Sequence, residues 1–267
     1  MLANGPSLNS VFSKAVVERS RPAAVAIVLV AFYGGIAIFA YNGFGDTMTE
    51  LFDAMPEGLR AVYGSSDGTP VGMAVGAVYA IIAPAVLLVF AIGGGTGAAV
   101  GEEMKGTLDL LLANPLSRTG VALWKWLVIV IGTVLIALAT WLSIGGAVLI
   151  LGKESGGRNL GALTVMLIGF GLMMGAFAMA LAAWTGRSTI GIGVASAIAV
   201  ASWLITTVLA VNPAFETISK FTPWYLYDGT DPIVNGISWW ALGLSLGLAV
   251  LFTFLTPLGL SRRDLKG

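Results

Sequence analysis

The polar side chains of this chain are concentrated in residues 101–118, which lie between two long apolar runs and read Gly-Glu-Glu-Met-Lys-Gly-Thr-Leu-Asp-Leu-Leu-Leu-Ala-Asn-Pro-Leu-Ser-Arg. Acids at the start, a run of leucines and a stop at Asn114-Pro115 predict a short amphipathic helix. The chemistry that such a helix can do is recognition: its charges orient a partner, and its leucines can fill a groove. A solvated helix with its leucines resting on lipid fits the same pattern equally well.

Catalysis is much harder to build from this composition. The chain has no cysteine and no histidine, so it lacks thiol nucleophiles, the commonest metal ligand and the near-neutral proton shuttle. It also contains no Gly-x-x-x-x-Gly-Lys-Ser/Thr phosphate loop. We therefore expect no catalytic, cofactor or metal site in this chain, and energy for any work must come from another subunit.

The elements that position the polar stretch are membrane spans. The 267 residues are 57% hydrophobic and 10% charged, with a mean hydropathy of +0.90, whereas soluble domains carry about 25% charged residues. A span needs about 20 apolar residues. We predict an all-α polytopic protein, with residues 1–267 as a single membrane domain. Its six spans are expected at about 22–41, 71–100, 123–151, 160–184, 190–211 and 238–260.

A helix along the membrane surface is predicted before the first span, over residues 7–21. Its apolar residues recur at helical spacing, and Lys14, Glu18 and Arg21 fall elsewhere around the helix. No small-residue cleavage site follows the first apolar run, so we expect a retained helix and not a signal peptide. The alternative is a frayed polar tail. The apolar residues are Leu8, Val11, Phe12, Ala15 and Val16.

The distribution of basic residues predicts the orientation. Of the 14 Lys and Arg residues, all except Arg60, Lys153, Arg158 and Lys220 fall on the side of the two chain ends. Because Lys and Arg are retained in cytoplasmic loops, both termini are expected in the cytoplasm. Residues 101–118 then face the cytoplasm as well.

The second span contains breaks in the helical pattern. Pro84 removes a backbone donor, and Gly93, Gly97 and Gly101 recur at four-residue spacing. Such glycines allow close approach of two helices, and a kink is expected near the proline. Gly171 and Gly175 in the fourth span are interpreted in the same way.

Residues 101–118 also resemble a known family signature. The matching motifs are Gly101-Glu102-Glu103, Gly106-Thr107-Leu108, Leu110-Leu111-Leu112-Ala113-Asn114-Pro115 and Ser117-Arg118. In order and spacing they are similar to type-2 ABC exporter permeases, and the similarity extends through Thr222-Pro223 to the end of the chain. Members of that family are six-helix permeases that pair as dimers. Each binds an ATPase subunit through a coupling helix, which here would be segment 101–118.

The resemblance implies a transporter subunit that is not itself an enzyme. ATP and magnesium would be bound by the partner ABC ATPase, and a second permease copy or sister permease would complete the complex in the plasma membrane. No nucleic acid partner is expected. Residues implied in ATPase contact are Glu102, Glu103, Gly106, Thr107, Leu108, Leu111, Pro115 and Arg118.

Cargo and rival functions remain open at this point. Charge-free spans and Met and Phe residues such as Met173, Met174 and Phe177 favour an amphipathic or hydrophobic cargo exported from the cell, although helix packing explains these residues too. One alternative is a membrane anchor or assembly protein that recruits a cytoplasmic partner. Another is a cation-coupled carrier, which normally needs an ionisable group within the membrane.

Overall fold

The computed structural model describes residues 8–56, 70–106, 117–152, 159–209 and 212–262. Every regular element in these ranges is a helix. Six helices are long and apolar enough to cross a membrane, which confirms the predicted fold class. These six spans are Val11–Phe44, Val71–Met104, Arg118–Ile150, Leu160–Thr185, Ser188–Val208 and Trp239–Ser261.

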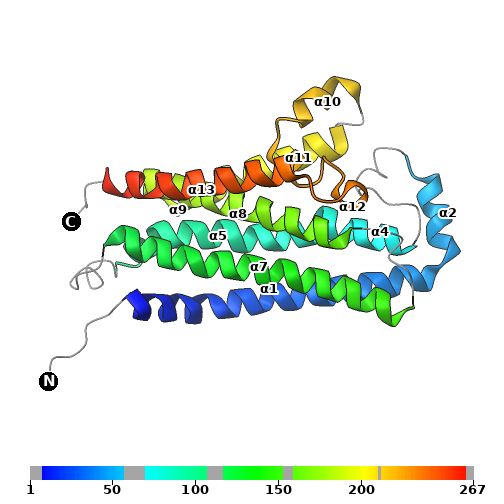
Figure 1. Ribbon diagram of the computed structural model, residues 1–267, viewed down its shortest axis with the longest axis horizontal. Helices are drawn as coiled ribbons and strands as arrows, with labels where there is room; N and C mark the ends of the chain where they lie inside the picture. Colours follow the sequence, from blue (N-terminus) through cyan, green and yellow to red (C-terminus); the bar gives the residue numbers. More distant parts are fainter. Residues whose placement is uncertain (1–7, 57–69, 107–116, 153–158, 210–211, 263–267) are drawn as a thin grey trace.

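The spans form an elongated bundle with both chain ends at the same end (Figure 1). Its long helices are α1 (Leu8–Phe44), α5 (Ala83–Met104), α7 (Arg118–Ile150), α8 (Leu160–Thr185), α9 (Ser188–Trp203) and α13 (Trp239–Ser261). Helix α8 lies at the centre, where it packs on α5, α7, α9 and α13, while α1 packs mainly on α7. We call the end with the chain termini the terminal end.

Short helices cover the opposite end of the bundle (Figure 1). They are α2 (Asp46–Ala54), α10 (Pro213–Ser219), α11 (Pro223–Tyr227) and α12 (Pro232–Asn235). Thr222 caps α11, because its side chain accepts a hydrogen bond from the backbone N–H of Tyr225. The stretch before the sixth span, which is rich in proline and aromatic residues, folds as α10 to α12 at this end of the bundle.

The first span differs from the prediction, because no helix end separates residues 7–21 from the apolar run. Helix α1 is continuous from Leu8 to Phe44 and contains Pro22. Val11 and Ala15 are buried within the protein, and the Phe12 ring meets the Trp124 ring of α7 edge-on. Three residues of the apolar stripe that suggested a separate surface helix, Val11, Phe12 and Ala15, therefore pack against protein, while Val16 is exposed. This packing stabilises the helix on the N-terminal side of Pro22.

The second span is broken into three parts, as the proline suggested. Helix α4 (Pro70–Ala77) passes into a π-helical turn, η1 (Val78–Ile82), before α5 begins. In this turn the Ala83 N–H bonds to the Val78 carbonyl, so it does not reach the Tyr79 carbonyl. Pro84, one residue later, has no N–H to offer. The Tyr79 carbonyl is instead bonded by the Tyr227 hydroxyl of α11, at 2.7 Å.

The glycines of the second span serve two different contacts. A Cβ at Gly95 would lie 2.3 Å from the Gly175 carbonyl oxygen, so this pair allows the close approach of α5 and α8. At Gly97 a Cβ would lie 2.3 Å from an Arg19 guanidinium nitrogen, whereas Gly93 and Gly101 have no neighbour within 4 Å of that position. Helix packing was therefore predicted correctly for Gly175, but the 93-97-101 face accommodates an arginine and not a second helix.

Candidate partner-docking site

Three helices meet at the terminal end, directly before the segment predicted to dock a partner. Helix α5 ends at Met104, with Gly106 at a φ of 66°, a backbone conformation that favours glycine and stops the helix. Helix α7 begins at Arg118, where the Ser117 hydroxyl accepts the Gly120 N–H at 3.0 Å. Residues 107–116 lie between these two ends and outside the described residues.

A buried ion pair joins the last turn of α5 to the first turns of α7. Glu102 is 4% exposed and Lys125 is 8% exposed. The Lys125 ammonium contacts the Glu102 carboxylate, and the Lys14 ammonium of α1 donates to the same Glu102 oxygen at 3.3 Å. One carboxylate thus holds all three helices, and because it is buried, it cannot lose either cation without a large electrostatic cost.

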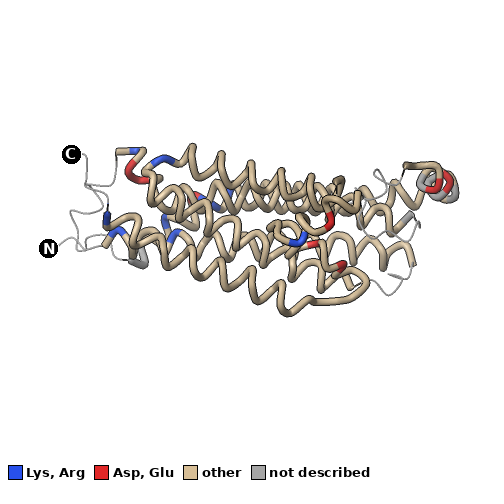
Figure 2. Tube along the Cα trace, turned by 90° about the horizontal axis from the view of Figure 1, so that it is seen from above, with Lys and Arg blue, Asp and Glu red and all other residues tan. Residues whose placement is uncertain are grey.

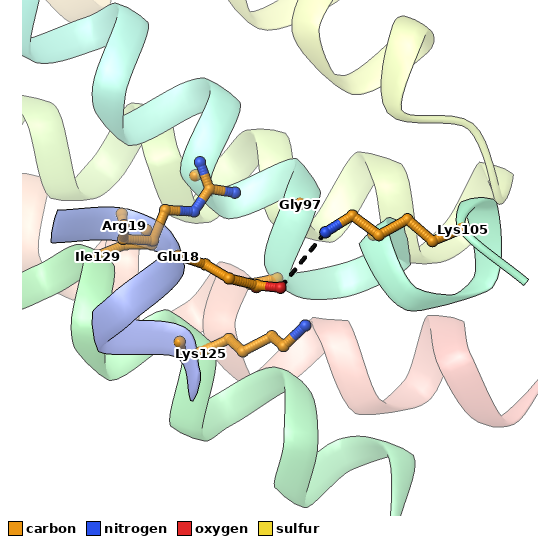
Figure 3. A pocket seen from close by; sticks show the side chains of 10 residues that line it. Glu18, Arg19, Gly97, Lys105, Lys125 and Ile129 are labelled. Atoms are coloured by element: carbon orange, nitrogen blue, oxygen red, sulfur yellow. Dashed lines mark hydrogen bonds and ion pairs between the residues drawn. The ribbon is translucent and has the colours of Figure 1, made fainter. Parts of the chain in front are cut away.

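A second, more exposed ion pair lies beside the first. The Lys105 ammonium is 3.5 Å from the Glu18 carboxylate, and Figure 3 shows this carboxylate turned toward Lys105 and away from the Arg19 guanidinium. We call the five residues Lys14, Glu18, Glu102, Lys105 and Lys125 the junction. It connects α1 and α7 to the end of α5 that leads into the predicted coupling segment.

The structure separates the two acids that were predicted to contact a partner. Glu103 is exposed, whereas Glu102 points into the bundle and presents almost no surface. Gly106 is exposed at the helix end. Glu102, Glu103 and Arg118 line one small pocket with Leu260 of α13. Thr107, Leu108, Leu111 and Pro115 lie outside the described residues, so the predicted amphipathic helix stays a prediction.

The sequence pattern missed Lys14, Glu18 and Lys125 as members of this site. For the orientation, Lys14 and Lys125 were counted among the basic residues on the side of the chain ends, and no ion pair was predicted for either. A signal for Lys125 was available, because a lysine inside an apolar run requires a partner, and the adjacent acids Glu102 and Glu103 end the preceding span. Lys14 and Glu18 had no such signal, since their distance from α5 in sequence is large and their helix was expected to lie on lipid.

Charge is unevenly distributed along the bundle. Figure 2 shows Lys and Arg gathered toward the terminal end, while acidic residues of α2 lie at the far end. Among the described residues no group of three or more His, Cys, Asp or Glu side chains could hold a metal ion. The junction consists of ion pairs between three helices at this basic end of the bundle.

Comparison with known protein families matches residues 11–265 of the chain to the model described as ABC-2 family transporter protein. The chain belongs to the ABC-2 transporter family. The match includes all six spans and both sides of the loop at 107–116. Comparisons with curated proteins and with solved structures give no match.

Family membership identifies the chain as a multi-pass membrane component of the permease type, which is generally not catalytic itself. It also implies association with an ABC ATPase subunit. The resemblance seen in the sequence motifs is therefore confirmed at the level of the family.

Proposed function

We propose that this ABC-2 permease exports an amphipathic or hydrophobic compound, driven by ATP that a separate ABC ATPase hydrolyses. The observation that carries the proposal is the junction, because it ties the start and the end of segment 101–118 to a third helix. A force applied to that segment would reach α1, α5 and α7 together. The family match over residues 11–265 supports the choice of an ATPase as the source of force.

Two neighbouring acids have different roles in this proposal. Glu103 is exposed and would face the ATPase, whereas Glu102 is a positioning residue that holds the loop ends in place. Thr107, Leu108, Leu111 and Pro115 would form the rest of the docking surface. This division refines the expectation that both acids touch the partner.

The complex would contain two permease chains and two ATPase subunits in the plasma membrane, with both termini in the cytoplasm. Support for this orientation comes from the basic residues at the terminal end (Figure 2). The apolar spans, in which buried methionines such as Met166, Met173 and Met174 pack near the bundle centre, support an apolar or amphipathic cargo. ATP and magnesium would bind only to the ATPase.

The test is ATP-dependent transport by the permease reconstituted with the ABC ATPase that co-purifies with it. Glu103→Ala should weaken ATPase binding and transport while thermal stability stays unchanged, because the side chain is exposed. Ser261→Ala, an exposed polar change at the terminal end of α13, is the matched control and should leave both unchanged.

Two rival functions give other results in the same experiment. An anchor or assembly protein would bind the ATPase but move no cargo in the presence of ATP. A cation-coupled carrier would transport along an ion gradient with the permease alone. Either result contradicts the proposal.

A further inference from the structure

A groove with a volume of about 730 Å³ runs between α1 and α5 near the terminal end. Its walls are apolar and include Val25 and Leu29 of α1 and Val89 and Phe90 of α5. Val89 is 76% exposed, so a large apolar side chain lies open on a helix that is otherwise mostly buried. An exposed apolar surface of this kind indicates a binding site for another molecule.

Two arginines lie at one end of this groove. Arg19 and Arg21 precede the apolar part of α1, and both line the groove. From Arg19 to Leu29 the helix rises about 15 Å, which is half of the roughly 30 Å apolar thickness of a bilayer. The groove therefore has the length of one leaflet, with its positive charge where the lipid head groups lie.

Both arginines have N–H donors beyond those used in the described contacts. Among the described residues, the Arg19 side chain donates one hydrogen bond, a long one of 3.5 Å to the Gly93 carbonyl, although a guanidinium carries five N–H donors. Arg21 is exposed and forms no ion pair within the described part of the chain. The nearby acids have other partners: Glu18 forms ion pairs with Lys105 and Lys14, and Glu102 forms ion pairs with Lys125 and Lys14. The charge of Glu18 also attracts Arg19, but the described residues include no ion pair between these two side chains.

We propose that this groove binds an anionic phospholipid of the leaflet on the terminal side. The phosphate accepts hydrogen bonds from Arg19 and Arg21, and an acyl chain lies along Val25, Leu29, Val89 and Phe90. Gly97 is part of the site, because only a residue without a side chain leaves room for the Arg19 guanidinium there. A second copy of the chain is a poorer occupant, since a two-fold axis along the groove would bring the arginines of both copies together.

The experiment uses the full chain alone, purified in neutral detergent, so its result does not depend on the proposed transport. Thermal unfolding and native mass spectrometry are followed during titration with phosphatidylglycerol, phosphatidylcholine or inorganic phosphate. Phosphatidylglycerol should bind more tightly than phosphatidylcholine, and inorganic phosphate should not stabilise the chain at the same concentration. Arg19→Gln and Arg21→Gln should each weaken phosphatidylglycerol binding about fivefold.

Arg187→Gln is the matched control, because Arg187 is exposed at the start of α9 and lines neither pocket beside α1. It should leave lipid binding unchanged. Arg21→Gln also guards against misfolding, since its side chain is exposed and its loss should not alter unfolding in the absence of lipid. The proposal would be overturned if phosphatidylglycerol and phosphatidylcholine bound equally well. It would also be overturned if Arg19→Gln and Arg21→Gln both bound phosphatidylglycerol as tightly as the wild type.

The absence of cysteine from the chain allows the groove to be probed directly. A V89C variant carrying a photoreactive label should capture phosphatidylglycerol in membranes. Efficient capture of a second permease copy in its place would show that the groove is a protein interface and would refute the lipid site. Stabilisation by inorganic phosphate alone would equally refute a site that needs the acyl chain.

Discussion

Glu102 and Glu103 are adjacent in sequence but face different surroundings, since one is buried with two lysines and the other is exposed. The sequence offers no way to tell them apart, because both precede a loop and both match the family motif. Their difference arises from tertiary packing: α1 and α7 each bring a lysine to the same side of α5. At the residue scale, the motif predicted the candidate site, and only the structure shows which of the two acids is exposed.

Glu102→Gln should destabilise the isolated permease strongly. Removing one partner of a buried ion pair leaves Lys125 buried without its counterion, which costs roughly 3–5 kcal/mol. The free energy of unfolding in detergent measures this effect. Replacing both Glu102 and Lys125 with apolar residues of similar size should cost much less, because no charge is then left buried.

Glu216→Gln is the control for this pair. Glu216 and Lys220 form an exposed ion pair one helical turn apart, with 63% and 49% of the side chains exposed. Such an exposed pair contributes little to stability, because water screens the two charges. If Glu102→Gln costs no more than this control, the junction does not hold the three helices together.

The raised pKa of Asp228 predicts that the free energy of unfolding depends on pH. Burial, and to a smaller extent the charge of Asp231, raises the pKa of Asp228 from an ordinary value of 3.8 to about 6. The folded chain therefore holds this proton more tightly than the unfolded chain. The contribution is fully present below pH 3.8 and is lost as the pH rises through about 6.

The measurement compares thermal unfolding of the wild type with that of Asp228→Asn from about pH 7 to about pH 4. All other carboxyl groups are the same in the two proteins, so the difference between the two curves isolates Asp228. The stability of the wild type relative to the variant should rise as the pH falls. A difference that is constant over this range would mean that the pKa of Asp228 is not raised.

At the scale of elements, the six spans could be predicted because each is a long apolar run bounded by charges, prolines or glycines. The predicted ends of five spans agree with the structure to within about five residues, and only the start of the first span differs by more. The continuity of α1 through Pro22 could not be predicted, because it depends on the packing of Val11, Ala15 and Phe12 against other helices. The π-helical turns were also beyond the pattern, since Pro84 predicted a kink but not its hydrogen bonds.

Both π-helical turns are hydrogen-bonded to α11 or to its N-cap residue, Thr222. Tyr227 donates to the Tyr79 carbonyl beside η1, and the Thr222 hydroxyl lies 2.6 Å from the Thr206 hydroxyl of η2 (Leu204–Val208). The Tyr227 ring also stacks on Phe170 of α8 at 5.6 Å. Helix α11 therefore links the irregular turns of the second and fifth spans to the centre of the bundle.

Tyr227→Phe should destabilise the chain by about 1–3 kcal/mol, because the buried Tyr79 carbonyl would lose the hydroxyl that satisfies it. The ring contacts with Phe170 and Trp224 would be retained, so the loss reports the hydrogen bond alone. Amide hydrogen exchange should become faster in η1 than in α8. Tyr225→Phe is the control, since the Tyr225 hydroxyl has no hydrogen bond among those described, and an equal loss in both variants would contradict the assignment.

At the scale of the whole molecule, the bundle has one end rich in basic residues and an opposite end that carries the acids of α2 (Figure 2). A positively charged end is retained in the cytoplasm during membrane insertion, so the terminal end is predicted to face inward. The proposed coupling to an ATPase requires this orientation, because the end of α5 and the start of α7, which flank residues 107–116, lie at the same end as the start of α1 and the end of α13 (Figure 1).

Single cysteines introduced into this cysteine-free chain can test the orientation. Ser261→Cys, at the exposed end of α13, should react with a membrane-impermeant maleimide only after the cells are permeabilised. Ala214→Cys, exposed in α10 at the opposite end, should react in intact cells. Both variants must retain wild-type transport for the labelling to count. The reverse pattern would place the loop at 107–116 outside the cell, where no ATPase subunit could bind it, and the proposed mechanism would fail even though the fold and the family remain the same.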